Sequence, residues 1–218
     1  KISFGMKHKA DVSGRRIDLD LINIVTPIGE IRVRLQALGQ HAIYNALAAT
    51  SVCLGLGVDL EDIQTGLEST KPLPGRLVRL KGIGGARILD DSYNANPASL
   101  FAALNALSQE AGEYWLVLGD MCELGNESAA LHKKAGEMAK EYGVTRLFGV
   151  GTFVQHAVEA FGAGAEHFSN YSRVVDILQD ELYEQVCVLI KGSRAMHLER
   201  IVSGVRVNMD SKFTYNEY

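Results

Sequence analysis

The amino-acid sequence predicts an α/β protein in which a mostly parallel sheet fills the C-terminal part of the chain. The first observation is that short apolar segments alternate with helix-length segments from residue 76 onward, which is typical of a sheet covered by helices on both faces. The second is that apolar and polar residues alternate between residues 17 and 36, which predicts an antiparallel β-hairpin.

The N-terminal region begins with this predicted hairpin, which turns at Thr26–Gly29. The residues expected to share a face in its two strands are Ile17, Leu19 and Leu21, followed by Ile31, Val33 and Leu35. A helix rich in alanine is expected at about 40–55, and because it is apolar nearly all round we expect it to be buried. A shorter helix at about 59–68 would start after Asp59, a residue type that caps helix N-termini.

The segment Lys71–Gly75 contains two of the four prolines of the chain, and proline prevents a helix from continuing. We therefore place a domain boundary there and predict domains over residues 1–74 and 75–218. The strands predicted in the second domain are Arg87–Asp90, Trp115–Leu118, Arg146–Val150 and Val186–Ile190. The helices predicted there cover about 98–109, 127–142, 154–161, 171–183 and 195–204, and residues 207–218 show no usable period.

The composition excludes several classes of protein. With 47% hydrophobic and 22% charged residues over 218 positions, the chain is long enough to bury a core and is not disordered. A formal net charge of −4 gives no case for nucleic acid, and no apolar run reaches the roughly 20 residues that span a bilayer. Three scattered cysteines indicate reduced core thiols. We expect a cytoplasmic protein without a signal peptide, and a fragment, because the chain starts at Lys1.

Polar segments follow three of the four predicted strands. They are Asp90–Pro97 (DDSYNANP), Gly119–Gly125 (GDMCELG) and Lys191–Arg194 (KGSR). The carboxyl ends of parallel strands lie at one edge of a sheet, where such folds bind ligands, so we expect these loops to converge. Together they offer carboxylates, amides, a lysine and an arginine, which makes this edge the predicted functional site.

The segment Asp90–Pro97 has residue types that suit a nucleotide site. A carboxylate at a strand end can accept hydrogen bonds from the hydroxyls of a ribose, and asparagine side chains can both donate to and accept from a base. Pro97 suits the first turn of a helix, which makes Asn96 a natural N-cap. The alternative is that these residues only turn and cap the chain.

The segment Lys191–Arg194 is a candidate anion site. We expect it between a strand and a helix, where backbone N–H groups attract negative charge, and Lys191 and Arg194 add full positive charges. The alternative is a surface loop with solvated charges.

Four further residues are candidates for a site. His41 and Asn45 share one face of their predicted helix, where they could address a ligand or be satisfied between the two domains. Arg76 could reach a nucleotide phosphate or pair with a carboxylate. His132 lies beside the apolar stripe of its helix and could be structural. No group of His, Cys, Asp and Glu has metal-ligand spacing, so we predict no metal site in this sequence, and no GxSxG nucleophile elbow is present.

Taken in order, these segments resemble the Mur ligase superfamily. The motifs are G-x-H-x-x-x-N at 39–45, PGR at 74–76, DDSYNANP at 90–97, LGDMCELG at 118–125, His132, and KGSR at 191–194. DDSYNANP and LGDMCELG are similar to the members that add D-alanyl-D-alanine, and the resemblance covers residues 1–206. It implies that residues 1–74 are the C-terminal half of a central ATP-binding domain and that residues 75–218 form a Rossmann-like ligase domain.

The resemblance also implies an activity. Such enzymes are ATP-dependent amide ligases of peptidoglycan synthesis and cell wall biogenesis, and this type joins D-alanyl-D-alanine to UDP-N-acetylmuramoyl-tripeptide through an acyl phosphate. It implies ATP, Mg²⁺ with ligands upstream of Lys1, and a monomer. The phosphate loop G-x-x-G-K-T of the family is not in this sequence, so we expect the 218 residues alone to be inactive.

By the same resemblance the candidate residues take three roles. Those expected at the nucleotide are His41, Asn45, Arg76, Asp91, Asn94 and Asn96. Those expected to be catalytic are Lys191, Arg194 and Asp120, and those expected at the other substrates are Ser193 and His132. Two alternatives remain: a folylpolyglutamate synthetase-type ligase of the same superfamily, and a non-catalytic Rossmann-like binding module in which the loops are structural.

Overall fold

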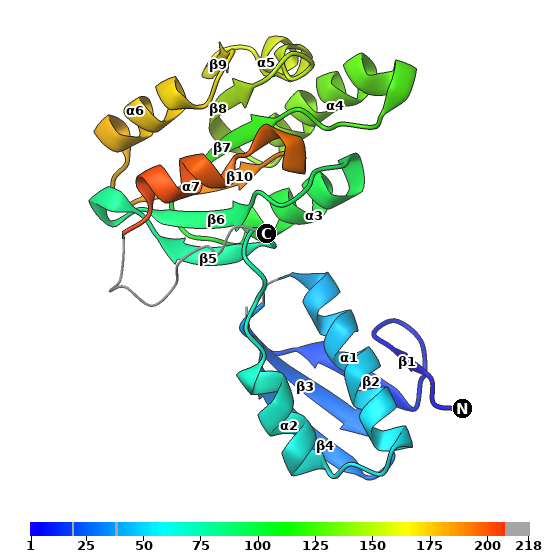
Figure 1. Ribbon diagram of the computed structural model, residues 1–218. Coiled ribbons are helices and arrows are strands. Elements are labelled where there is room, and N and C mark those ends of the chain that lie inside the picture. Colours follow the sequence, from blue (N-terminus) through cyan, green and yellow to red (C-terminus); the bar gives the residue numbers. More distant parts are fainter. Residues whose placement is uncertain (19, 38, 208–218) are drawn as a thin grey trace. The chain divides into compact units, whose positions relative to one another are not determined.

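The computed structural model describes residues 1–18, 20–37 and 39–207. The chain divides into two compact units, Lys1–Val78 and Arg79–Tyr218, and the division falls just after the proline-rich segment Lys71–Gly75 (Figure 1). The predictions made for Leu19 and for the chain after residue 207 lie outside the described residues.

The first unit is a small sheet with two helices. In its described residues the strands follow one another in the order β1-β2-β3-β4. Their bounds are β1 Phe4–Gly5, β2 Val12–Arg16, β3 Leu21–Thr26 and β4 Gly29–Arg34, and the helices are α1 Gln40–Gly55 and α2 Leu60–Ser69 (Figure 1). Apolar residues of the sheet and of both helices form one core.

The predicted hairpin is confirmed as β3 and β4, which pair in antiparallel fashion, but the buried face of its first strand is not the predicted one. Ile22 and Ile24 are buried, whereas Ile17 is 46% exposed. The chain has already left β2 at Ile17 and turns there, with its N–H donating to the carbonyl oxygen of Leu21. Ile22 and Ile24 lie directly opposite Val33 and Ile31 of β4. Since directly opposite residues share a face of the sheet, the even-numbered residues of β3 lie on the buried side with them. The residues of the second strand that are buried as predicted are Ile31, Val33 and Leu35.

Both predicted helices of this unit are confirmed, but α1 is not buried all round. Ala46 and Leu47 are buried, whereas Val52 is 63% exposed. The helix packs against the strands with one face only, so its apolar composition did not require a second packing partner within the unit. At the start of α2, the Asp59 side chain accepts a hydrogen bond from the Asp62 N–H at 2.9 Å, which confirms the predicted cap.

The second unit is an α/β layer structure. Its strands are β5 Val78–Lys81, β6 Arg87–Asp91, β7 Glu113–Gly119, β8 Val144–Val150, β9 Ala165–Phe168 and β10 Val186–Lys191. Its helices are α3 Pro97–Leu107, α4 Ser128–Glu141, α5 Gln155–Phe161, α6 Ser172–Glu181 and α7 Glu199–Val205 (Figure 1). In the described residues the strand order is β5-β6-β10-β7-β8-β9, and the pairs β6–β10, β10–β7, β7–β8 and β8–β9 are parallel. The mostly parallel sheet is therefore confirmed.

The differences from the predicted elements lie at the edges of this sheet and at one turn. The short strands β5 and β9 were not predicted, because each occupies one edge and holds only four residues with charged side chains among them. The helix predicted at 195–204 is split into a 3₁₀ turn, Arg194–Met196, and α7. His197 lies between them with a left-handed φ of 50°, which interrupts an α-helix.

The position of β10 creates the place where a ligand can bind. On one face of the sheet, α6 and α7 pack over a core that includes Ile88, Val117 and Val188. The other helices, α3, α4 and α5, contact one another and the strands β8 and β10. The helices that follow β6 and β7 thus lie on the opposite face from α7, which follows β10 between them (Figure 1). Open α/β sheets bind ligands at the carboxyl ends of the strands where this switch occurs.

The cysteines only partly match the prediction of core thiols. Cys187 is buried within β10, and this burial raises the pKa of its thiol to about 12. Cys53 is half-buried, but Cys122 is exposed, because it lies in the loop after β7.

Among the described residues, no helix combines the length and the apolar character that a membrane crossing requires.

Candidate functional site

The three polar segments singled out in the sequence come together at one edge of the second sheet, as predicted. We call them the β6 loop (Ser92–Asn96), the β7 loop (Asp120–Leu124) and the β10 loop (Gly192–Ser193). The strands β6, β10 and β7 are immediate neighbours, so their carboxyl ends are adjacent. Lys191, the last residue of β10, is in register with Asp91 on one side and with Leu118 on the other.

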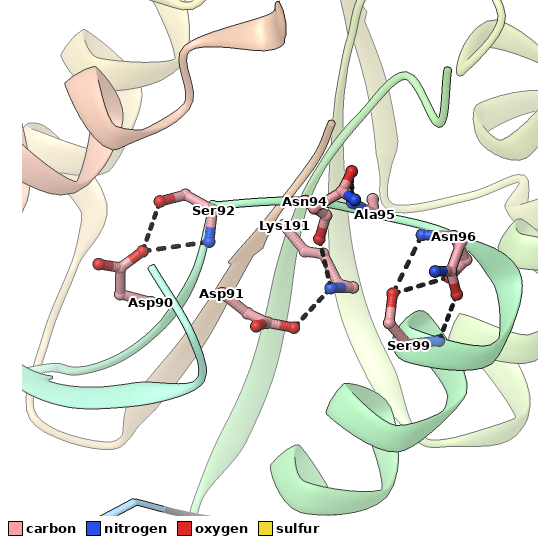
Figure 2. Close-up of polar contacts among 8 residues, drawn as sticks. All are labelled: Asp90, Asp91, Ser92, Asn94, Ala95, Asn96, Ser99 and Lys191. Carbon is pink, nitrogen blue, oxygen red and sulfur yellow. Dashed lines mark hydrogen bonds and ion pairs between the residues drawn. The ribbon is translucent and has the colours of Figure 1, made fainter. Parts of the chain in front are cut away.

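The buried side chain of Lys191 contacts Asp91 and the β6 loop at the centre of this edge (Figure 2). The Lys191 ammonium group donates to Asp91 Oδ2 at 2.5 Å and to the backbone carbonyl oxygen of Asn94 at 2.8 Å. The lysine side chain is 1% exposed, while that of Asp91 is 17% exposed. Burial lowers the pKa of Lys191, and the negative charge of Asp91 opposes that effect. The ammonium group of this candidate catalytic lysine is thus buried and bound by groups of the protein itself.

The rest of the β6 loop is shaped by its own side chains (Figure 2). The Asp90 carboxylate accepts hydrogen bonds from the Ser92 hydroxyl at 2.6 Å and from the Ser92 N–H at 3.2 Å. The Asn94 side-chain oxygen accepts from the Ala95 N–H at 2.8 Å. These contacts fix the turn that carries Asn94, whose side chain is exposed.

Asn96 caps α3, as predicted. Its side-chain oxygen accepts from the Ser99 N–H at 2.8 Å, and the Ser99 hydroxyl oxygen accepts from the Asn96 N–H at 3.0 Å, which completes a reciprocal capping box (Figure 2). The capping box does not use the side-chain nitrogen Nδ2 of Asn96, which could donate to a nucleotide.

Asp120 ties the β7 loop to the loop after β8. Its two carboxylate oxygens accept hydrogen bonds from the N–H groups of Thr152 and Val154, both at 2.8 Å. Gly151 lies against this carboxylate with a φ of 125°, and a Cβ atom there would come within 2.6 Å of Asp120 Cγ. Both oxygens of this candidate catalytic residue are thus used in joining two loops, and the close approach requires glycine at residue 151.

His132 holds the next residue of the β7 loop. Its Nε2 accepts from the Met121 N–H at 2.9 Å, and its Nδ1 lies 2.7 Å from the carbonyl oxygen of Ser128. Since a carbonyl only accepts, these partners assign the proton to Nδ1 of a neutral ring. The side chain has no exposed surface and stacks against Phe153. The geometry favours the structural alternative for His132, because both of its nitrogens face partners inside the chain.

Ser193 joins the β10 loop to the β7 loop. Its hydroxyl oxygen accepts from the Cys122 N–H at 2.8 Å, and its own N–H donates to the carbonyl oxygen of Asp120 at 3.0 Å. Ser193 is 4% exposed. Like Asp120 and His132, it contributes to the shape of this edge. Only a small part of the surface of Ser193 is accessible for the predicted contact with a substrate.

Arg194 is a candidate residue at this edge whose side chain extends into solvent. Its side chain is 58% exposed, with one guanidinium nitrogen 3.7 Å from a Glu199 carboxylate oxygen. The guanidinium also lies over the ring of Tyr93, at 5.8 Å from the centroid. Tyr93 is 43% exposed. It was not singled out from the sequence as a site residue, although its position within DDSYNANP was the available signal.

The three remaining candidates belong to the first unit. His41 and Asn45 lie in the first turns of α1 and both are exposed. Arg76 is exposed in the segment that follows α2, where its N–H donates to the carbonyl oxygen of Leu73 at 3.2 Å.

Within the part of the chain that the structure describes, no three His, Cys, Asp or Glu side chains are grouped in a way that could hold a metal ion. The residues present thus do not by themselves fit a Mg²⁺ site.

The chain is similar in sequence to a known protein family and to proteins of known name. The family described as Mur ligase, glutamate ligase domain, matches residues 75–194. A protein of Escherichia coli strain K12 named UDP-N-acetylmuramoyl-tripeptide--D-alanyl-D-alanine ligase is 39% identical over 185 residues, which are 84% of this chain and 41% of that protein. The chain therefore spans less than half the length of this relative.

Solved structures agree with the sequence comparison. A crystal structure of MurF from Acinetobacter baumannii has a TM-score of 0.82 and 34% identity, and the match covers 93% of this chain and 46% of that one. MurF ligase from Thermotoga maritima, solved in complex with ADP, has a TM-score of 0.79 over 93% of this chain and 47% of that one. At 22% identity it shows the shared fold.

Proposed function

This chain belongs to the Mur ligase family, and we propose that it is part of an ATP-dependent ligase that joins D-alanyl-D-alanine to UDP-N-acetylmuramoyl-tripeptide in peptidoglycan synthesis. The observation that carries the proposal is the convergence of DDSYNANP, LGDMCELG and KGSR on three adjacent strands. The 39% identity to the Escherichia coli ligase of that name supports the substrate class. The same identity favours this type of ligase over the folylpolyglutamate synthetase type.

The reaction we propose has two steps. A carboxylate oxygen of the tripeptide attacks the γ-phosphorus of ATP, which forms an acyl phosphate and releases ADP. The amino group of D-alanyl-D-alanine then attacks the acyl carbon, the C–O bond to phosphate breaks, and an amide, inorganic phosphate and a proton result. Negative charge accumulates on the transferring phosphoryl group, so cations and N–H dipoles near it accelerate the first step.

The exposed candidates would contact the substrates directly. We propose that the first unit is the C-terminal half of an ATP-binding domain, from which His41, Asn45 and Arg76 contact the nucleotide. From the second unit, Asn94 would contact the nucleotide beside Asp91. The guanidinium of Arg194 is exposed at the same edge and can face a phosphate or a carboxylate.

The proposed contributions of Asp120, Ser193 and His132 run through loop geometry. Each holds a backbone group of the β7 loop or of the loop after β8, so each would set where those loops meet the substrates. These contributions involve no metal ion, and the described residues contain no group of ligands that could hold one.

The experiment that tests this function uses the full-length parent protein. Release of phosphate from ATP should require both UDP-N-acetylmuramoyl-tripeptide and D-alanyl-D-alanine, with either substrate alone leaving the rate at background. Phosphate release that depends on a folate and glutamate instead would overturn the proposal.

The 218-residue chain by itself provides the matched comparison. Its sequence has no G-x-x-G-K-T phosphate loop, which is the element that cradles the phosphates in this type of enzyme. We therefore expect no phosphate release above a buffer blank from this chain with all three substrates. Turnover above that blank would contradict the assignment of the phosphate loop to another part of the protein.

A further inference from the structure

Lys191 differs from the usual surface lysine in where its charge is placed. Its ammonium group lies at the carboxyl end of the central strand β10, and its side chain is 1% exposed. Lysine is almost never buried to this degree unless it is paired. The partners that satisfy it are Asp91 and Asn94, which are distant in the sequence, so the contacts are made only in the folded state.

The two partners of Lys191 define the course of the β6 loop (Figure 2). Asp91 Oδ2, at 2.5 Å, lies where the strand ends, and the Asn94 carbonyl oxygen, at 2.8 Å, lies in the following turn. An ammonium group has several donors and can hold both oxygens at once. An apolar side chain of similar length would fill the space but would bind neither oxygen.

We propose that Lys191 is a positioning residue, which contacts no substrate and instead holds the Asp91 carboxylate and the Asn94 turn in the arrangement that meets the nucleotide. The proposal rests on the function proposed above, since it concerns the same site. It changes the role expected from the sequence, in which Lys191 was catalytic.

Two further observations support this assignment. The lysine charge is neutralised by Asp91 at the point of contact, so the positive charge that this edge presents to an anion comes from Arg194, which is 58% exposed. The two residues that Lys191 holds are more accessible to a ligand than Lys191 itself. Asn94 is exposed and the Asp91 side chain is 17% exposed. A buried ion pair contributes little net stability, so its value here would be in fixing one conformation of the loop.

Acylation of lysine amines in the 218-residue chain tests the buried position of Lys191 without any assay of activity. With a small acylating reagent and peptide mass spectrometry, we expect Lys191 to react more than about tenfold slower than Lys134, because reaction at a buried amine requires local opening. Lys134 is an exposed lysine of α4 and serves as the internal control. Equal rates at the two lysines would overturn the proposal.

Hydrogen exchange tests whether Lys191 holds the loop. In the Lys191→Met variant, peptides that cover the β6 loop should exchange about tenfold faster, while those from β7 keep the wild-type rate. The matched variant Lys134→Met should leave both unchanged. If the β6 loop exchanges at the wild-type rate in Lys191→Met, Lys191 does not position it. If this variant fails to fold, the acylation rates of the wild-type chain still test whether the Lys191 amine is buried, and equal rates would still overturn the proposal.

A double-mutant cycle on nucleotide affinity in the full-length parent separates positioning from direct contact. We expect Lys191→Met and Asp91→Asn each to weaken ATP binding by about tenfold, and the double variant to be no more than about threefold weaker than either, because Lys191 acts through Asp91. Multiplied effects in the double variant would make Lys191 an independent contact and overturn the proposal. Absence of ATP binding by the wild-type parent would instead count against the proposed function.

Discussion

The candidate residues of the two units are held in contrasting ways. In the first unit, His41 and Asn45 extend from one exposed face of α1. In the second unit, Lys191, Asp120 and His132 are buried and bind backbone or side-chain groups of neighbouring loops. The first group can meet a ligand without any change in the fold, while the second group forms the fold of the site itself.

Polar residues that the sequence marks as candidates can therefore either contact a ligand or hold the loops of the site. An exposed polar residue can be replaced at small cost to folding, so a loss of function in such a variant reports the lost contact with the ligand. A buried polar residue cannot be removed without leaving its partner unsatisfied, which costs more than the hydrogen bond contributes. Substitutions in the two units should therefore separate in stability, with the largest losses in the second unit and the smallest in the first.

The largest effect is expected for Asp91→Asn, which leaves the buried charge of Lys191 without its partner. We expect the free energy of unfolding of the chain to fall by about 3 kcal/mol at about pH 7, as measured by urea denaturation. The control Asp180→Asn changes an exposed carboxylate of α6 and should leave stability unchanged.

The loss in Asp91→Asn should also depend on pH. Burial already lowers the pKa of Lys191, and removing Asp91 removes the contribution that raises it. Between this lowered pKa and the ordinary lysine value, the folded state binds fewer protons than the unfolded state, so stability increases with pH. The free energy of unfolding that Asp91→Asn loses relative to the wild type should thus be smaller at about pH 10 than at about pH 7. An equal loss at both pH values would contradict the buried charge.

A smaller loss is expected for Asp120→Ala, which removes the acceptor of the Thr152 and Val154 N–H groups. Because those bonds involve an ionised acceptor, the free energy of unfolding should fall by about 2 kcal/mol. Hydrogen exchange should also accelerate at the start of α5. The same substitution at exposed Asp180 is the control, and a loss no greater than that of the control would show that Asp120 does not join the loops.

Loss of the α3 cap should cost less again. Asn96→Ala removes the acceptor of the Ser99 N–H and should lower the free energy of unfolding by about 1 kcal/mol. Asn96→Asp keeps an acceptor at the same place and should remain within about 0.5 kcal/mol of the wild type. If the two variants are equally stable in urea denaturation, the cap contributes nothing to folding.

The smallest effect on stability is expected in the first unit. His41→Ala and Asn45→Ala remove exposed side chains from α1 and should change the free energy of unfolding by less than about 0.5 kcal/mol. In the full-length parent, both should weaken ATP binding, whereas Ala49→Ser on the same helix should not. A loss of stability comparable to that of Asp120→Ala would remove the contrast between the two units.

Much of the fold could be predicted from the sequence, because its signals are local. The strands Val186–Lys191 and Arg87–Asp91 are apolar runs next to helical segments, and that alternation predicts a parallel sheet. The cap at Asn96 was predictable because an N-cap asparagine followed by Pro97 is a local pattern. Even the convergence of the three loops follows from the direction of parallel strands.

The buried face of β3 shows where local signals end. Ile17 continues the alternation of apolar residues, but the turn between β2 and β3 sets where the new strand begins. The register with β4, in which Ile22 and Ile24 lie opposite Val33 and Ile31, decides which face is buried. That register cannot be read from the alternation of residues within one strand.

The polar residues that gather at the carboxyl edge of the second sheet can be identified from the sequence, because strand direction and loop position are encoded locally. Which of them are exposed and which are buried depends on tertiary packing. His132 binds the Met121 N–H, and Asp120 binds the N–H groups of Thr152 and Val154. Every residue except proline carries such an N–H, so no residue type in the sequence marks these partners, and their choice follows from how the loops pack.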